Sequence, residues 1–208
     1  GAMCPSYMAT LEEEHSTRGR ANALRAALAG RLDGEGLRSK QLFEVMDLCL
    51  ECKACKGECP SNVDMAKLKY EFLAHYYGEH GYPLRSHLFA KIDRFNRLAS
   101  PVAGLANWLM DTSLSRWALD QLGIDSRRRM PKLASQTFSQ WFARRPAPPA
   151  GKRGTVVLFN DTFLEYNDPQ IGVAAAALLE AAGFSVVLPA PRVCCGRPLI
   201  SKGFLAQA

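Results

Sequence analysis

Four cysteines fall within a stretch of eleven residues: Cys49, Cys52, Cys55 and Cys59, at the spacing C-x2-C-x2-C-x3-C, with Pro60 directly after the last. Cysteine thiolates are ligands for soft metal centres such as zinc and iron–sulfur clusters. Two residues between successive thiolates let a tight loop place three sulfurs on three irons of a cube, and this spacing is typical of a 4Fe–4S cluster. The run therefore predicts an iron–sulfur site.

A structural zinc site is the alternative, because four thiolates also satisfy a tetrahedral ion. Zinc sites usually pair two C-x2–4-C hooks that lie far apart in the sequence, whereas here all four cysteines are contiguous. The spacing favours the iron–sulfur cluster, and a zinc-stapled, non-catalytic interaction module is kept as the second hypothesis.

A fifth cysteine, Cys4, is followed by Pro5 and has the form of the end of a second run of the same kind. In two-cluster proteins the last cysteine of each run binds the other cluster. We therefore expect Cys4 to join Cys49, Cys52 and Cys55 on one 4Fe–4S cluster. Cys59 then belongs to a second cluster, whose other cysteines would lie upstream of this sequence. A loose terminal thiol is the alternative interpretation of Cys4.

Helices must hold these cysteines. Apolar residues at helical spacing predict a helix over residues 16–30, and a second one that begins near Ser39 and carries Cys49 at its buried side. A third helix follows Asp64, with Met65, Leu68, Phe72 and Tyr76 on one face. The cysteine loop thus lies between helices, which predicts an α-helical ferredoxin-like domain over residues 1–82.

Residues 83–145 are also predicted to be helical, and a proline-rich linker over 146–153 follows them. Tryptophan, leucine and arginine alternate between Leu105 and Leu122. Aromatic stripes at helical spacing are usually core, so we expect these helices to pack on the cluster domain or on a partner. A membrane-lying or quinone-facing surface is the alternative.

The pattern changes at Gly154. Two short β-branched runs, 155–159 and 184–188, flank an alanine-rich helical segment, which predicts a parallel β-α-β unit. Cys194 and Cys195, followed by Gly196, come after the second strand, where ligands bind in such folds. We interpret these two cysteines as part of a metal or cluster site, and two small apolar residues at a strand end are the alternative. The fold class is thus mainly α, followed by the start of an α/β domain over 154–208.

Composition adds general constraints. The chain has 208 residues and a formal charge of +6, with 48% hydrophobic and 22% charged residues, as in ordinary globular proteins. The sequence predicts no transmembrane helix and no secretory signal. Seven cysteines, most of them in ligand-like motifs, indicate a reducing, cytoplasmic compartment. The positive charge is not clustered with aromatic residues, so nucleic-acid binding is not expected. Both ends of the sequence are expected to be cut, and residues 1–3 are either native or a vector remnant.

Several segments together resemble one family. They are C-P-S-Y-M-A-T, E-E-E-H-S-T-R-G-R-A-N, the cysteine run with P-S-N-V-D-M, F-N-D-T-F-L-E-Y-N-D-P, and C-C-G-R-P-L-I-S-K-G. These segments resemble the carboxyl half of FAD-linked dehydrogenases of the D-lactate/D-2-hydroxyglutarate type. They are similar to the glycolate oxidase iron–sulfur subunit and to a subunit of anaerobic glycerol-3-phosphate dehydrogenase as well.

The resemblance implies a role in electron transfer. A flavin, held by a fused or separate domain outside this sequence, would oxidise a D-2-hydroxy acid, and clusters would carry single electrons to a quinone or another acceptor. This chain would hold one complete 4Fe–4S cluster and no catalytic residue, with Cys194 and Cys195 in the cysteine-rich CCG domain. The protein would be an oxidoreductase of the cytoplasm, with a peripheral contact to the inner membrane left open.

Overall fold

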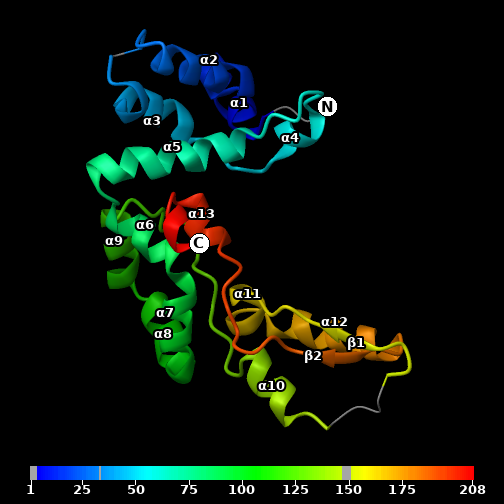
Figure 1. Ribbon diagram of the computed structural model, residues 1–208. Coiled ribbons are helices and arrows are strands. Elements are labelled where there is room, and N and C mark those ends of the chain that lie inside the picture. Colours follow the sequence, from blue (N-terminus) through cyan, green and yellow to red (C-terminus); the bar gives the residue numbers. More distant parts are fainter. Residues whose placement is uncertain (1–3, 33, 147–150) are drawn as a thin grey trace. The chain divides into compact units, whose positions relative to one another are not determined.

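The computed structural model describes residues 4–32, 34–146 and 151–208, and its residues gather into two units (Figure 1). Unit 1 takes in the described residues up to Ala90 together with Gly196–Ala208, and unit 2 is Lys91–Cys195. Helices dominate, and the strands of the described part form one parallel two-stranded sheet. The predicted fold class, mainly α with the start of an α/β domain, is confirmed.

Unit 1 contains short helices grouped around one long helix. Its α-helices are α1 (Pro5–Thr10), α2 (Thr17–Leu28), α3 (Lys40–Asp47), α4 (Ala54–Glu58), α5 (Met65–His80), α6 (Leu84–Ala90) and α13 (Arg197–Ser201). Short 3₁₀ turns are η1 (Glu13–His15), η2 (Gly36–Arg38) and η4 (Leu205–Gln207). Side chains of Ser16, Ser39 and Asp64 accept backbone N–H bonds at the starts of α2, α3 and α5. These bonds satisfy amides that a helix start leaves without a partner.

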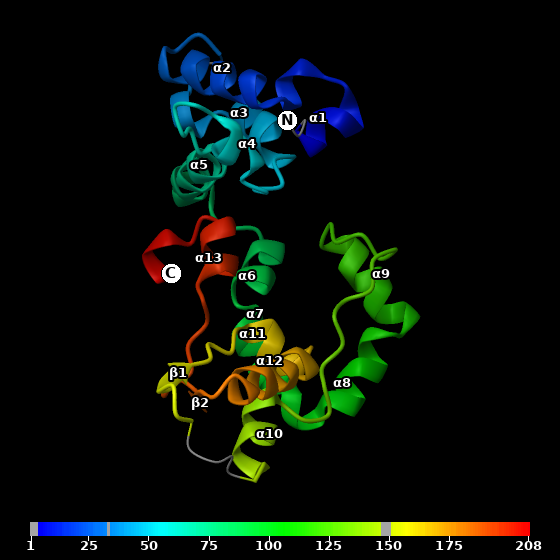
Figure 2. The same ribbon diagram turned by 90° about the vertical axis from the view of Figure 1, so that its right-hand side faces the viewer.

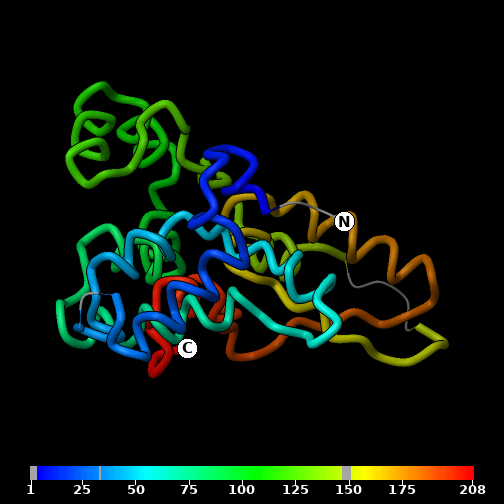
Figure 3. Tube along the Cα trace, turned by 90° about the horizontal axis from the view of Figure 1, so that it is seen from above, coloured from blue at the N-terminus to red at the C-terminus, as the bar shows by residue number. Residues whose placement is uncertain are grey.

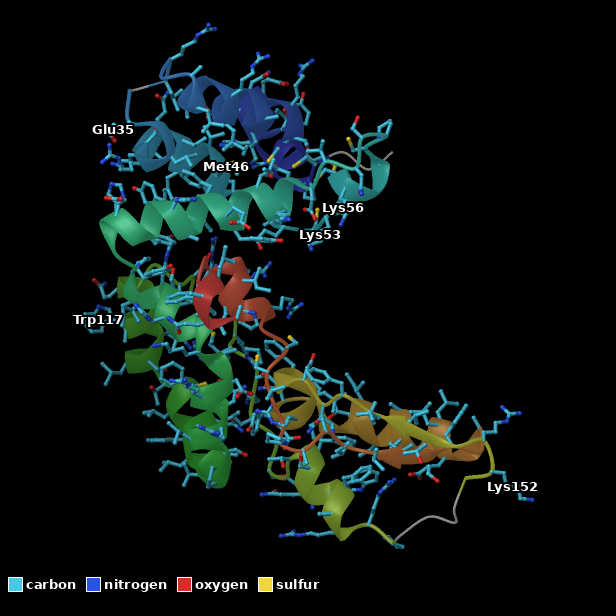
Figure 4. The ribbon with its side chains drawn as sticks, in the orientation of Figure 1. Glu35, Met46, Lys53, Lys56, Trp117 and Lys152 are labelled. Carbon is cyan, nitrogen blue, oxygen red and sulfur yellow. The ribbon has the colours of Figure 1, made fainter. Side chains whose placement is uncertain are left out.

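The core of unit 1 lies between α2, α3 and α5, where Figure 4 shows Met46. Its buried residues are Ala27, Leu42, Met46, Met65, Phe72, Leu73 and Tyr77. The helix predicted to begin near Ser39 is present as α3, and its residues Leu42, Val45 and Met46 are buried. The predicted row of α5 is partly wrong: Leu68 is exposed, and Lys69 lies on the buried side instead.

The end of the chain packs within unit 1, where α13 contacts α6 and η4 contacts α5. Tyr82, just after α5, stacks on Phe204 with ring centroids 4.0 Å apart, and its hydroxyl donates to the Gly203 carbonyl at 2.9 Å. A side chain at Gly203, where φ is +77°, would lie 2.9 Å from backbone atoms of Leu73 and Ala74. The two units therefore differ from the predicted division at 82, 145 and 153. The two units are defined by contacts within one chain and do not test the predicted domain boundaries, which stay a prediction.

Unit 2 holds the β-α-β segment (Figure 2). Strands β1 (Thr155–Val157) and β2 (Ser185–Val187) pair in parallel, with Val156 opposite Val186, and α12 (Pro169–Ala181) connects them after the short α11 (Thr162–Tyr166). The predicted β-α-β unit is thus present. The remaining helices of the unit are α7 (Ile92–Ala99), η3 (Ser100–Val102), α8 (Ala103–Met110), α9 (Ser113–Gln121) and α10 (Phe138–Arg144).

Helices α8 and α9 stand away from β1, β2 and α12 (Figures 2 and 3). Trp108 is 66% exposed and Trp117 59%, and Leu105, Leu109 and Leu114 are exposed as well. The described residues therefore leave this stripe uncovered, and its packing on a partner stays a prediction. No helix in the described part of the chain combines the length and the apolar character needed to cross a bilayer.

Candidate iron–sulfur site

The five cysteines predicted to bind clusters lie at helix ends or in the loops beside them. Cys4 is the N-cap residue of α1. Cys49 follows the end of α3, and Cys52 lies in the loop that leads to α4. Cys55 is inside α4, and Cys59 is the C-cap residue of that helix. Short helices and tight loops thus deliver all five thiols.

These five cysteines line a single hollow of about 250 Å³ in unit 1. Residues of α2 and α5, such as Arg20 and Met65, complete its wall. Cys52 is exposed and the other four are half-buried, and none forms a disulfide. The structure therefore brings together every cysteine that the sequence analysis assigned to the clusters, including Cys4 from the start of the chain.

The cysteine loop bends through two residues in the left-handed region. Glu51 has a φ angle of +54° and Lys53 one of +61°, values that residues other than glycine seldom adopt. Residues held there are common at functional sites, where neighbouring structure imposes the strain. The loop then continues into α4, beside which Figure 4 labels Lys53 and Lys56. Their ammonium groups lie 3.8 and 3.7 Å from the Asp64 carboxylate. These contacts tie the loop to the start of α5.

Cys4 lies in a polar environment that favours its thiolate. Arg20 Nη1 donates to Cys4 Sγ at 3.4 Å, and Ser6 Oγ lies 3.2 Å from the same sulfur. Burial opposes ionisation, but the hydrogen bonds from Ser6, the Tyr7 amide and Arg20 outweigh it and lower the pKa of the Cys4 thiol to about 7. A thiol in this environment is suited to metal binding, which requires the thiolate.

The ammonium group of Lys69 lies next to the backbone of Cys49. Lys69 Nζ donates to the Cys49 carbonyl at 2.7 Å and to the Asp47 carbonyl at 2.8 Å, and it lies 4.0 Å from the Glu51 carboxylate. Burial raises the pKa of the Cys49 thiol, and Lys69 and Arg20 act in the opposite direction. Burial also lowers the pKa of Lys69, which Glu51 partly offsets.

The hollow between the cysteines leaves room for a cluster. Thiolates about 2.3 Å from a tetrahedral zinc lie roughly 3.8 Å from one another. In the described residues, one group of at least three potential ligand atoms lies within 4.8 Å of one another. It consists of Glu12, Glu14 and His15 and includes no cysteine. The cysteines instead surround an open hollow, as a cube of irons and sulfides requires.

Cys194 and Cys195 belong to unit 2, and the structure shows a polar cluster around the first. The buried Thr162 hydroxyl lies 3.4 Å from Cys194 Sγ and donates to the Asp93 carboxylate at 2.9 Å. Arg192 pairs with the same carboxylate and donates to the Tyr166 hydroxyl. Cys195 is exposed. The role of both cysteines as metal ligands stays a prediction.

Sequence reasoning missed Arg20 and Lys69, both of which contact the cysteine segments. Each is a charged residue at a position that the helix buries: Arg20 lies two turns before Ala27 on α2, and Lys69 lies one turn after Met65 on α5. A cation interrupting a buried row was a usable signal, because long charged side chains are rarely buried without partners.

Comparison with known proteins agrees with this geometry. The model of a family described as "4Fe-4S dicluster domain" matches residues 2–64, a span that contains all five cysteines of the hollow. Residues 2–64 are thus similar to 4Fe–4S dicluster domains. The family resemblance inferred from the sequence is thereby confirmed in its iron–sulfur part.

The curated relatives extend the likeness along the chain. D-2-hydroxyglutarate dehydrogenase of Pseudomonas putida is 29% identical over 98% of this chain and 24% of its own length. A subunit of the anaerobic glycerol-3-phosphate dehydrogenase of Escherichia coli is 34% identical over 60% of this chain and 32% of its own. A probable glycolate oxidase iron–sulfur subunit of Bacillus subtilis is 25% identical over 93% and 46%. The chain therefore spans less than half the length of each of these relatives. No solved structure matches the chain.

Proposed function

We propose that this chain is the iron–sulfur electron-transfer portion of a flavin-dependent D-2-hydroxy acid dehydrogenase. The observation that carries the proposal is the single hollow lined by five cysteines, in a segment that matches the model of a 4Fe–4S dicluster domain. The likeness to D-2-hydroxyglutarate dehydrogenases over nearly the whole chain supports the reaction class. The likeness to a probable glycolate oxidase iron–sulfur subunit supports the electron-transfer role.

Cys4, Cys49, Cys52 and Cys55 would hold one 4Fe–4S cluster, and Cys59 would belong to a second cluster completed by other parts of the protein. Such a cluster supplies one-electron transfer when it is bound. The chain's own residues fix the thiols through α1, α4 and the left-handed loop, and they set the charge around the sulfurs. In this proposal the chain itself holds no catalytic residue.

The partners follow from this role. A flavin domain carrying FAD, fused or separate, would deliver electrons, and a quinone or another acceptor would receive them. Relatives named as subunits of oxidoreductases support a partner of this kind. Cys194 and Cys195 would contribute to a further metal or cluster site in the CCG domain of unit 2. The cytoplasmic location also stays a prediction.

The exposed surface of α8 and α9 supports a peripheral contact with an anionic membrane. Its apolar residues are Leu105, Trp108, Leu109, Leu114 and Trp117. A hollow of about 240 Å³ close to it is lined by cations, among them Arg116, Arg127, Arg128, Arg129 and Lys132. Tryptophan and leucine beside arginine suit the boundary between lipid headgroups and acyl chains.

Metal analysis tests the cluster assignment directly. We expect about four irons and four acid-labile sulfides per chain, with an electron paramagnetic resonance (EPR) signal on reduction, in protein purified without oxygen. Stoichiometric zinc without iron would reject the electron-transfer role and favour the zinc-stapled interaction module. A chain bound to nucleic acid would instead show a steep loss of affinity with salt, which we do not expect.

A further inference from the structure

Two buried cations, Arg20 and Lys69, lie next to the cysteine hollow. Arg20 is 1% exposed and Lys69 is 6% exposed, although both carry long charged side chains that normally reach water. They come from different helices, α2 and α5. Burying a cation is costly unless hydrogen bonds compensate it, so each of the two needs several acceptors around it.

Arg20 links three segments of unit 1. Its Nη1 donates to Cys4 Sγ at 3.4 Å, its Nη2 donates to the Ser6 hydroxyl at 2.9 Å, and its Nε donates to the Val45 carbonyl at 3.1 Å. The guanidinium fork thereby holds the start of α1 against the end of α3. One of its donors points at the sulfur of a predicted cluster ligand.

Lys69, on α5, likewise links α5 to the segment that begins the cysteine run. Its ammonium group donates to the backbone carbonyls of Asp47 and Cys49 at 2.8 and 2.7 Å. The Glu51 carboxylate, 4.0 Å away, lies on the same short loop. The charge of Lys69 is thus fixed under the segment that begins the cysteine run.

Part of this arrangement is structural. The last carbonyls of a helix lack partners within it, and Val45 and Asp47 carry two of those at the end of α3. Each cation also contacts groups beyond those that helix capping requires. Arg20 reaches the Cys4 sulfur and Lys69 reaches the Cys49 carbonyl, so both reach residues that would bind the cluster.

We propose that Arg20 and Lys69 are positioning residues that fix Cys4 and Cys49 at the cluster and raise its reduction potential. This inference rests on the proposed function. Reduction places one more electron on the cluster without breaking a bond, and a nearby cation stabilises that added charge most where water is excluded. Hydrogen bonds to cluster sulfurs and burial are known determinants of the potential.

The experiment is an EPR-monitored redox titration of the full chain, with iron and sulfide counted in every sample. Lys69→Gln and Arg20→Gln keep polar donors but remove the charge. The matched control is Lys67→Gln, which removes an exposed cation two positions earlier on the same helix.

At a fixed solution potential, we expect the ratio of reduced to oxidised cluster to fall at least tenfold in each test variant, equivalent to about 59 mV for one electron. Lys67→Gln should titrate like the unmodified protein. Lys69→Arg and Arg20→Lys, which keep the charge, should recover most of the lost potential.

Unchanged midpoints in Lys69→Gln and Arg20→Gln, with clusters present, would overturn the inference and leave the proposed function standing. If a glutamine variant binds no iron, the variant that keeps the charge at that position, Lys69→Arg or Arg20→Lys, decides. Normal iron content and a normal midpoint potential in that variant support the inference. Loss of iron in that variant as well assigns the residue a packing role and rejects the inference. An unmodified chain without iron would instead refute the proposed function.

Discussion

Cys4 and Cys59 line the same hollow but are held differently. The Cys4 thiol lies against Arg20 and Ser6, and its pKa is lowered to about 7 by these and neighbouring groups against the effect of burial. Cys59 caps the end of α4, where its backbone amide donates to the Cys55 carbonyl at 3.0 Å. The contacts of Cys4 support the proposal that it is the fourth ligand of a cluster held by Cys49, Cys52 and Cys55.

Serine substitution separates the two roles. We expect Cys4→Ser to lose most of its iron and the EPR signal of the reduced cluster, because a ligand thiolate is removed. Cys59→Ser should keep about four irons per chain, since its partner cluster would need further cysteines. Iron analysis and EPR of both variants are the measurement. Loss of the cluster in Cys59→Ser with retention in Cys4→Ser would reverse the assignment.

The cysteines could be predicted from the sequence because ligand spacing is local. A cation within an apolar row could have pointed to Arg20 and Lys69, but their contacts could not be predicted because the partners lie far along the chain. Lys69 donates to the Cys49 carbonyl, and Arg20 donates to the Val45 carbonyl and the Cys4 sulfur. From the pattern of apolar residues alone, a charged residue in a helix is predicted to face the solvent. Here backbone carbonyls compensate the charge and keep it inside.

At the scale of elements, the start of α2 packs tightly on η1 through Gly19. A side chain there would lie 2.0 Å from the Glu13 carbonyl oxygen and 2.7 Å from Glu14 Cα. Backbone atoms of this kind cannot move aside as a flexible side chain can. Ser16 accepts the Gly19 amide at 2.9 Å, so the cap and the close contact coincide. This corner places Arg20 next to Cys4.

Gly19→Ala should therefore destabilise unit 1 by about 1–3 kcal/mol, the usual cost of overpacking. Gly78→Ala is the matched control: Gly78 is also helical, but a side chain there meets no atom within 4 Å. It should stabilise the protein by up to about 1 kcal/mol, because alanine favours a helix more than glycine does. Denaturant unfolding measures both, and equal effects would show that the contact at Gly19 is unimportant.

Helix positions were predictable where the apolar spacing was clean, and α3 and α12 follow their patterns. On α5 the pattern suggested Leu68, but the buried face runs through Met65, Lys69, Phe72 and Leu73. The short α11 has a start signal only in Asp161, whose carboxylate accepts the amides of Phe163 and Leu164. Such a helix of five residues depends on tertiary packing, which local sequence does not report.

At the scale of the whole molecule, the two units should respond separately to loss of metal. Cys52→Ala removes a predicted ligand, and cluster binding is part of the folding energy of such a domain. Amide hydrogen exchange should rise across unit 1 and stay unchanged in β1, α12 and β2. Cys195→Ala, a control in unit 2, should leave unit 1 protected. Loosening of both units by Cys52→Ala would contradict their independence.

The α8–α9 surface leads to a second prediction at this scale. Replacing Trp108 and Trp117 by glutamine should weaken binding to phosphatidylglycerol-containing vesicles at least tenfold, because both side chains are exposed beside a cationic hollow. The control variant replaces Ile171 and Leu178, which are exposed on α12, by glutamine as well. Co-sedimentation measures the binding. Equal binding by both variants, or none by the unmodified protein, would contradict a membrane contact through this surface.

Unit 1 is discontinuous: the chain leaves it after Ala90 and returns at Gly196, where Tyr82 receives Phe204 and the backbone of Gly203. Every residue lining the cysteine hollow lies before position 67. Because a ribosome releases the amino-terminal part of a chain first, the hollow is synthesised long before the segment that covers Tyr82. During biogenesis, the thiols of the hollow therefore exist before the segment that completes unit 1 has been made.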